Sequence, residues 1–138
     1  MNNTEQKPKE ILELEEIYQI RIEEKKVGLT AKNTYTVNTK REITALDLSF
    51  NELTEIKGLE SFTSLERLDL AYNQITEIKG LDNLIKLNYL NLTNNPLKIN
   101  GLENLPHLKI TNLSCRSERN IVNSLDGSKS LQEILDSL

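Results

Sequence analysis

The chain of 138 residues has no tryptophan, one cysteine, one histidine and three prolines. Because Cys115 is the single thiol, no disulfide can form within the chain, so a disulfide-stapled secreted scaffold is excluded and a cytoplasmic, intracellular location is expected. The sequence also lacks a phosphate-binding glycine loop and any paired metal-ligand motif, and His107 follows Pro106 in an expected loop. It therefore predicts no catalytic residue, no cofactor and no metal, and we expect that the protein is not an enzyme.

Long apolar runs and an excess of basic charge are missing as well. No run approaches the roughly 18 apolar residues of a membrane span, and the first residues lead into charged positions without the apolar segment of a signal peptide. The 17 Lys and Arg residues are scattered among 21 Asp and Glu residues, and the net charge is −4. We therefore expect no membrane association, and we expect nucleic acid to be an unfavoured partner.

What the chain does contain is a repeat with a period of 22 residues. Residues 46–53, 68–75 and 90–97 share the pattern Leu-x-Leu-x-x-Asn-x-Leu, with isoleucine at the last position of the second copy. The first apolar position of the repeat falls at Ile43, Leu65, Leu87 and Leu108, so about four coils are expected, the last imperfect. A single coil cannot bury its apolar side chains, so the period predicts a stacked solenoid.

Two recurring residue types have a structural interpretation. A buried asparagine amide can satisfy backbone groups that a turning chain leaves without partners, and a glycine can adopt positive φ where the chain swings to the outer side. We assign both types to the scaffold. They are Asn51, Asn73 and Asn95, and Gly58, Gly80 and Gly101.

These motifs resemble the leucine-rich repeat family, over about residues 43 to 113. The 22-residue coil with its Ile-x-Gly-Leu-x-x-Leu return is most similar to the class found in a nuclear regulatory subunit of protein phosphatase 1 and in bacterial internalins. The resemblance implies an α/β fold: a short solenoid with a parallel concave β-sheet and short helical or 3₁₀ segments on the convex side. It also implies binding of other macromolecules, usually proteins, through the concave face.

The flanks are expected to cap the solenoid with helices at both ends, because an open end exposes core and unpaired backbone. We divide the chain into an N-terminal cap (1–42), the repeats (43–113) and a C-terminal helical cap (114–138). The first cap should hold a helix over 8–19 and an extra strand near 35–37; the last should hold helices over 117–125 and 128–138. Alternatively, the N-terminal segment is a peptide-binding arm, or the last helix docks onto a partner or a second copy.

The alternation of strand side chains assigns the exposed face of the sheet directly. Four columns run across the coils, and three of the six aromatic residues fall on them. The columns are Ala45, Arg67, Tyr89 and Ile110; Asp47, Asp69, Asn91 and Asn112; Ser49, Ala71, Thr93 and Ser114; and Phe50, Tyr72, Asn94 and Cys115.

Seven residues on these columns are the expected contact patch for a partner. Phe50 and Tyr72 have an alternative interpretation, since an aromatic before the repeated asparagine can pack along the sheet for stability alone. The like charges of Asp47 and Asp69, on neighbouring strands, repel each other, and Arg67 on the next column could relieve that repulsion. A glycosidase-like carboxylate pair is rejected, because a short open sheet has no deep pocket. The predicted partner-binding residues are Asp47, Phe50, Arg67, Asp69, Tyr72, Tyr89 and Asn91.

The sequence thus predicts a non-catalytic protein–protein interaction module, a small adaptor, regulator or inhibitor that binds a partner protein through the concave face. We expect a monomer or weak self-association. One alternative is a ribonucleoprotein-associated repeat protein, which strong salt dependence of binding would favour. The other is a self-associating structural module or a fragment of a larger repeat protein.

Overall fold

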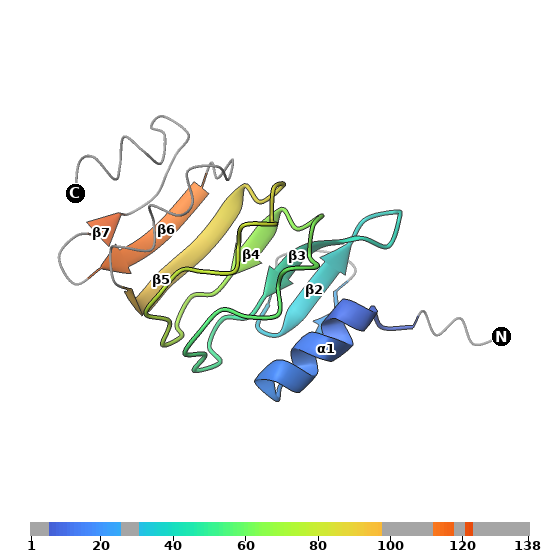
Figure 1. The fold of residues 1–138 in the computed structure, drawn as a ribbon, viewed down its shortest axis with the longest axis horizontal. Helices are drawn as coiled ribbons and strands as arrows, with labels where there is room; N and C mark the ends of the chain where they lie inside the picture. Colours follow the sequence, from blue (N-terminus) through green and yellow to red (C-terminus); the bar gives the residue numbers. More distant parts are fainter. Residues whose placement is uncertain (1–5, 26–30, 98–111, 118–120, 123–138) are drawn as a thin grey trace.

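The computed structural model describes residues 6–25, 31–97, 112–117 and 121–122. The strands of these residues form one sheet, in which they lie in the same order as in the chain (Figure 1). Helix α1 lies at the N-terminal end of the sheet, beside β2 and β3. The elements are α1 (Lys9–Tyr18), β1 (Glu23–Glu24), β2 (Thr34–Val37), β3 (Ile43–Asp47), β4 (Arg67–Asp69), β5 (Tyr89–Leu97), β6 (Asn112–Ser117) and β7 (Ile121–Val122).

The repeats form the parallel part of the sheet, at the predicted register. Strands β3, β4 and β5 are parallel, with Asp47 opposite Asp69 and Asp69 opposite Asn91. Each step is one 22-residue coil, so equivalent residues of successive coils lie side by side. The predicted parallel sheet and the pairing of equivalent residues in the first three coils are therefore confirmed, but Ala45, Ser49 and Ala71, which the prediction placed on the exposed face, are buried.

A ladder of asparagines holds the bends together, as predicted. The Asn73 Nδ2 group donates to the carbonyls of Leu48 at 3.0 Å and Leu70 at 2.9 Å, so it joins two coils. Its Oδ1 atom accepts hydrogen bonds from the backbone N–H groups of Asn51 and Leu53, both at 3.0 Å. Asn73 is buried, and these contacts supply partners to backbone groups that could not reach water.

The return segments run on the other side of the sheet and close the core. They are chains of turns in which a backbone N–H bonds the carbonyl three residues earlier, as in a 3₁₀ helix: Phe62 to Leu59 and Leu65 to Phe62 at 3.1 Å, repeated one coil later. Gly58 and Gly80 have φ of 81° and 76°, as predicted, whereas Gly101 lies outside the described residues. The buried repeat side chains form one core, which includes Leu53, Ile56, Leu59, Phe62, Leu65, Leu68, Leu70, Ile75, Ile78, Leu81, Leu84, Leu87, Leu90 and Leu92.

Helix α1 and strand β2 cover the first coil. Ile11 and Leu14 are fully buried, whereas Ile17 is 41% exposed. The Tyr18 hydroxyl donates to the Lys57 carbonyl and accepts from the Lys57 N–H, both at 2.8 Å, which ties the helix to the first return segment. Strand β2 pairs antiparallel with β3, as the extra-strand prediction required.

The C-terminal end differs from the prediction. Tyr89 is opposite Asn112 and Asn91 is opposite Ser114, so the last step is 23 residues instead of 21, and Cys115 is opposite Leu92 instead of Asn94. Ile121–Val122 is a strand antiparallel to β6, where a helix over 117–125 was expected. The fourth coil lacks the ladder asparagine, so its pattern does not fix its register. Ile110 and the helix over 128–138 lie outside the described residues, and the boundaries at 42 and 113 stay predictions.

Among the residues that the structure describes, no helix has the length and apolar character needed to cross a lipid bilayer.

Candidate functional site

The exposed face of the sheet, which we call the concave face, has a regular central row. In this row the side-chain oxygen of each residue accepts a hydrogen bond from the backbone N–H two residues later. Asp47 accepts from Ser49 at 3.0 Å, Asp69 from Ala71 at 2.9 Å and Asn91 from Thr93 at 3.1 Å. The row thus has a structural task that an aspartate and an asparagine both perform.

Asp47 lies below the surface of this row. Its side chain is 4% exposed, and its Oδ1 atom also accepts the Ser49 hydroxyl at 2.6 Å. The register places Thr34 of β2 on one side of it and Asp69 on the other. Asp47 therefore supports the face from within, and the expectation that it offers an exposed carboxylate to a partner is wrong.

Asp69 is only partly buried, and its carboxylate accepts two hydrogen bonds. The Ser49 hydroxyl donates to Asp47 and the Thr93 hydroxyl donates to Asn91. Residue 71 is alanine, so Asp69 accepts the backbone N–H of this residue but no hydroxyl. Its Oδ2 atom accepts the Asn91 Nδ2 group at 3.2 Å. In the described part of the chain, no lysine or arginine forms an ion pair with it within 4 Å.

The electrostatic setting of Asp69 disfavours its charge. Burial raises its pKa, and the negative charge of Asp47 raises it further. The Ala71 N–H, the Asn91 amide and the charge of Arg67 act in the opposite direction, but the pKa stays above its ordinary value. The expected repulsion between the two carboxylates, and its partial relief by Arg67, are both present.

Arg67 and Tyr89 form a contact of their own at the start of the strands. The Arg67 guanidinium carbon lies 4.1 Å from the centre of the Tyr89 ring, a cation–π distance. Arg67 is exposed and Tyr89 is partly exposed. The Arg67 guanidinium is therefore engaged by an aromatic ring, and no ion pair between it and Asp69 is present among the described residues.

Phe50 and Tyr72 form an exposed aromatic stack at the other end of the strands. Their ring centres are 4.3 Å apart with an angle of 8° between the planes, and they are 54% and 50% exposed. Both residues have left-handed backbone conformations, with φ of 58° and 56°, as has Asn94 with φ of 57°. Asparagine tolerates this conformation, whereas a bulky side chain is strained in it. The repeat pattern located these residues but gave no signal for their conformation.

The face extends further than the sequence indicated. Thr34 is opposite Asp47 and Thr36 is opposite Ala45 across the antiparallel pair β2–β3, so these threonines continue the central and first columns. The alternation around Tyr35 predicted the strand, and the Tyr35 ring is buried, so its neighbours Thr34 and Thr36 point to the other side of the sheet. Both threonines are partly exposed and were missing from the predicted patch.

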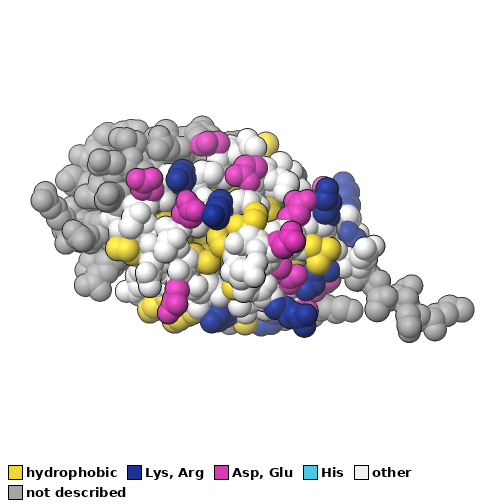
Figure 2. Space-filling model, turned by 60° about the horizontal axis from the view of Figure 1, so that its bottom comes forward, with side chains coloured by type: hydrophobic (Ala, Val, Ile, Leu, Met, Phe, Trp, Pro, Cys, Tyr) yellow, Lys and Arg dark blue, Asp and Glu magenta, His cyan; other side chains and the backbone are white. Residues whose placement is uncertain are grey.

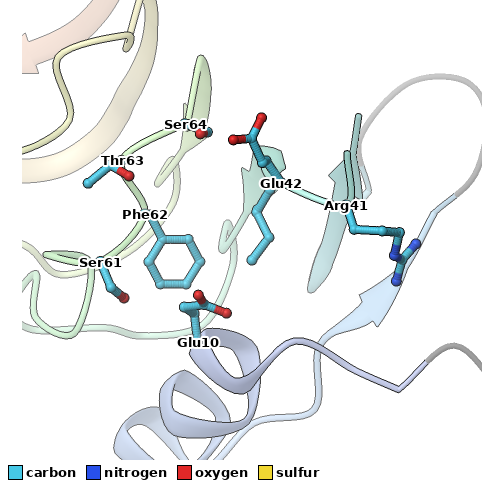
Figure 3. Close-up of a pocket in the computed structure, with 8 residues that line it drawn as sticks. Glu10, Arg41, Glu42, Ser61, Phe62, Thr63 and Ser64 are labelled. Carbon is cyan, nitrogen blue, oxygen red and sulfur yellow. The ribbon is translucent and has the colours of Figure 1, made fainter. Parts of the chain in front are cut away.

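A separate cavity of about 200 Å³ lies away from this face, at the junction of α1, the β2–β3 connection and the first return segment (Figure 3). Its lining includes Glu10, Glu42 and the hydroxyl residues Ser61, Thr63 and Ser64. The Arg41 guanidinium at its rim pairs with Glu24 at 2.8 Å. Within the described residues, no group of three or more His, Cys, Asp and Glu side chains is arranged to hold a metal ion. The cavity is therefore lined mainly by polar side chains, and the described residues around it form no metal site.

Charged side chains of both signs are interspersed on the face shown in Figure 2. Lys and Arg side chains lie next to Asp and Glu side chains among polar and uncharged atoms. A surface of this kind lacks the continuous positive potential that attracts a phosphate backbone.

Comparison with known families identifies the repeat unit. The family model described as "Leucine Rich repeats (2 copies)" matches residues 41–83 and again residues 63–104. These are leucine-rich repeats. The matched segments contain β3, β4 and β5 and the return segments that follow β3 and β4, so the repeats whose register is described above are the ones that the family model recognises.

Among solved structures, the leucine-rich repeat chain is similar to an internalin from Listeria monocytogenes, with a TM-score of 0.55 and 24% sequence identity. The match covers 85% of this chain and 36% of that chain, so the chain spans about a third of the internalin's length. At this identity the likeness concerns the fold. No curated protein is significantly similar to the chain. Leucine-rich repeat domains generally act as protein-interaction modules, and this chain has the architecture of one.

Proposed function

We propose that this leucine-rich repeat chain is a non-catalytic binding module, a small adaptor, regulator or inhibitor, that contacts a partner protein through its concave face. The contact surface comprises two aromatic elements on either side of a carboxylate. The two aromatic elements are the Phe50–Tyr72 stack and the Arg67–Tyr89 pair. The carboxylate between them is that of Asp69, which is hydrogen-bonded to Asn91.

The exposed aromatic stack is the observation that carries this proposal. A left-handed backbone costs a bulky residue about 1 kcal/mol, and Asn94 occupies the equivalent position in the next coil without that cost. The chain nevertheless has two large rings there, each about half exposed. Strained and exposed aromatic residues are typical of surfaces that bury them against a partner.

The size of the face limits the kind of complex. Four strands with about five residues each span about 300 Å², well below the roughly 800 Å² per partner of a standard interface. The threonines of β2 and the turns after Phe50 and Tyr72 enlarge the area somewhat. We therefore expect the face to bind a peptide-like segment of the partner, with moderate affinity.

The location proposed for this interaction is intracellular. It rests on the single cysteine, which excludes the intrachain disulfides that stabilise many small extracellular domains. The chain matches about a third of the internalin's length, and the proposal concerns the repeats whatever the length of the natural protein.

The test is affinity capture from the lysate of the source organism with two variants of the chain. One carries Asp69→Ala and Tyr89→Ala on the concave face; the other carries Glu77→Gln and Lys79→Gln, two exposed residues of a return segment. A protein that the wild type and the return-segment variant capture, and the concave variant does not, would support the proposal. Capture that disappears with nuclease treatment would favour a ribonucleoprotein, and a mass that rises with concentration would favour self-association.

A further inference from the structure

The central row has two carboxylates whose charge its structural role does not require, and Asp69 is the more exposed of the two. In the third coil Asn91 accepts the backbone N–H of Thr93 at 3.1 Å and the Thr93 hydroxyl at 2.7 Å without any net charge. Asp69 performs the same backbone task in the second coil with a carboxylate. A neutral side chain is thus sufficient at this position of the repeat, and the charge of Asp69 needs another explanation.

That charge also lies in an unfavourable place for the isolated chain. Asp69 is opposite Asp47 on the neighbouring strand, and both are at least partly withdrawn from water. Like charges on adjacent strands repel, and removing them from water increases the cost. Arg67 lies one column away, with its guanidinium 4.1 Å above the Tyr89 ring. Within the described residues, the carboxylate of Asp69 has no cation in ion-pair distance.

The hydrogen bonds of Asp69 leave room for a further donor. Its carboxylate accepts one backbone N–H and one amide group at 3.2 Å, whereas an ionised carboxylate can accept about four hydrogen bonds. The alanine at position 71 supplies no hydroxyl, unlike Ser49 and Thr93 at the equivalent positions. A donor that approaches from solvent therefore finds free acceptor capacity on the second coil.

We propose that Asp69 is the subsite for one lysine or arginine side chain of an extended partner segment, and that the Phe50–Tyr72 stack receives an apolar side chain of the same segment. This inference rests on the proposed function and adds the chemistry of the partner. Tyr72 follows Asp69 by three residues and has a left-handed backbone, so the two positions lie within about 10 Å, the length of three extended residues. The basic and the apolar residue of the partner are therefore separated by two or three positions.

The charge of the row selects against other occupants. Phosphate groups would meet the negative charges of Asp47 and Asp69 at the centre of the face, so a nucleic acid strand or a phosphopeptide is disfavoured there. A cation relieves the repulsion between the two carboxylates when it binds, which is the source of its selectivity. An uncharged segment would bury Asp69 without a counter-charge and would bind more weakly.

The experiment is selection of displayed random peptides on the immobilised full chain, followed by affinity measurements on the enriched peptides. The variants are Asp69→Asn, Phe50→Asn with Tyr72→Asn, and Glu77→Gln as a control that removes an equal charge from an exposed site of a return segment. We expect the enriched peptides to contain a lysine or arginine two or three positions from an apolar residue. Replacing that basic residue with glutamine should weaken binding about tenfold in the wild type and much less in Asp69→Asn.

The outcomes separate this inference from the proposed function. Peptides without a basic residue that lose binding with the aromatic variant but keep it with Asp69→Asn would overturn the cation subsite and leave the concave binding face intact. Peptides whose binding none of the concave variants changes, or the absence of any enrichment, would overturn both. Wild-type binding that weakens as NaCl rises from about 0.05 M to about 0.5 M would agree with an ion pair at the site.

Discussion

Asp69 and Asn91 occupy equivalent positions in successive coils, and the Asn91 amide donates to the Asp69 carboxylate at 3.2 Å. Each of them accepts the backbone N–H two residues further along, from Ala71 and Thr93. Their shared task explains why the repeat uses short polar side chains here. Their difference in charge explains why the two coils are not interchangeable for binding.

The first prediction concerns the pH dependence of stability at Asp69. Burial and the charge of Asp47 raise the pKa of this carboxyl in the folded protein, so the folded state holds its proton to higher pH than the unfolded state does. The stability that this group contributes is present below its unfolded pKa and is lost as the pH rises through its folded pKa. The free energy of unfolding of Asp69→Asn should therefore increase relative to that of wild type as the pH rises. The altered hydrogen bond to Asn91 adds a difference between the two proteins that does not depend on pH.

The measurement is the free energy of unfolding in urea from about pH 3 to about pH 7. The difference between Asp69→Asn and wild type should move in favour of the variant across this range. A constant difference, or a difference that moves toward wild type, would mean that the pKa of Asp69 is not raised.

The second prediction concerns the asparagine ladder. Asn73→Ala removes a buried amide that donates to carbonyls of two coils and accepts two backbone N–H groups. Buried backbone groups would lose their partners, and the variant should lose about 3 kcal/mol of the free energy of unfolding. Gln74→Ala, at the exposed neighbouring position, should stay within about 0.5 kcal/mol of wild type. Equal effects of the two substitutions in urea unfolding would refute the structural role of the ladder.

The third prediction separates scaffold from site at Phe50 and Tyr72. Replacement of both with asparagine relieves strain, because asparagine tolerates positive φ, and it loses an aromatic stack worth about 0.5–1.5 kcal/mol. The two effects oppose each other, so the thermal midpoint should change little while partner binding is lost. Phe62→Ala, which empties a buried position, should cost about 3–5 kcal/mol. If the asparagine variant unfolded as easily as Phe62→Ala, the stack would belong to the scaffold.

The fourth prediction compares two glycines of the return segments. Gly58 and Gly80 both have positive φ, but a Cβ at Gly58 would lie 2.6 Å from Ile17 Cδ1, whereas the nearest atom at Gly80 is 3.5 Å away. Alanine should therefore destabilise position 58 more than position 80, by about 1 kcal/mol. Adding Ile17→Ala should recover part of the loss at position 58 and none at position 80. Thermal unfolding of the four variants checks this, and an equal loss at both glycines would contradict the packing of α1 on the first return.

The sequence predicted the repeats well because their signals are redundant. Each of the first coils carries the leucine pair, the ladder asparagine and the return glycine at fixed spacing, so their register could be derived before the structure was known. The predicted register is wrong in the last coil, where these repeated signals are incomplete. The last coil has Arg116 where the period expects asparagine, and its strand is displaced from the expected pairing.

The candidate site was predictable in position but not in environment. Strand alternation assigned Asp47 and Asp69 to one exposed row, yet Asp47 is 4% exposed. Thr34 of β2 lies opposite Asp47 across an antiparallel pair, and β2 lies outside the repeat pattern. The left-handed backbone of Phe50 and Tyr72 was equally invisible, because no propensity predicts such a conformation for an aromatic residue.

We propose that a partner protein binds the concave face. The most direct test is the dissociation constant of the captured partner, measured by calorimetry, for wild type, Asp69→Ala with Tyr89→Ala, and Glu77→Gln with Lys79→Gln. We expect the concave variant to bind at least about tenfold more weakly, a change of about 1.4 kcal/mol, while it stays folded at the temperature of the measurement although the Ala71 N–H loses its acceptor, and we expect the return-segment variant to bind as wild type does. Unchanged affinity of the concave variant together with weaker binding of the return-segment variant would contradict the account.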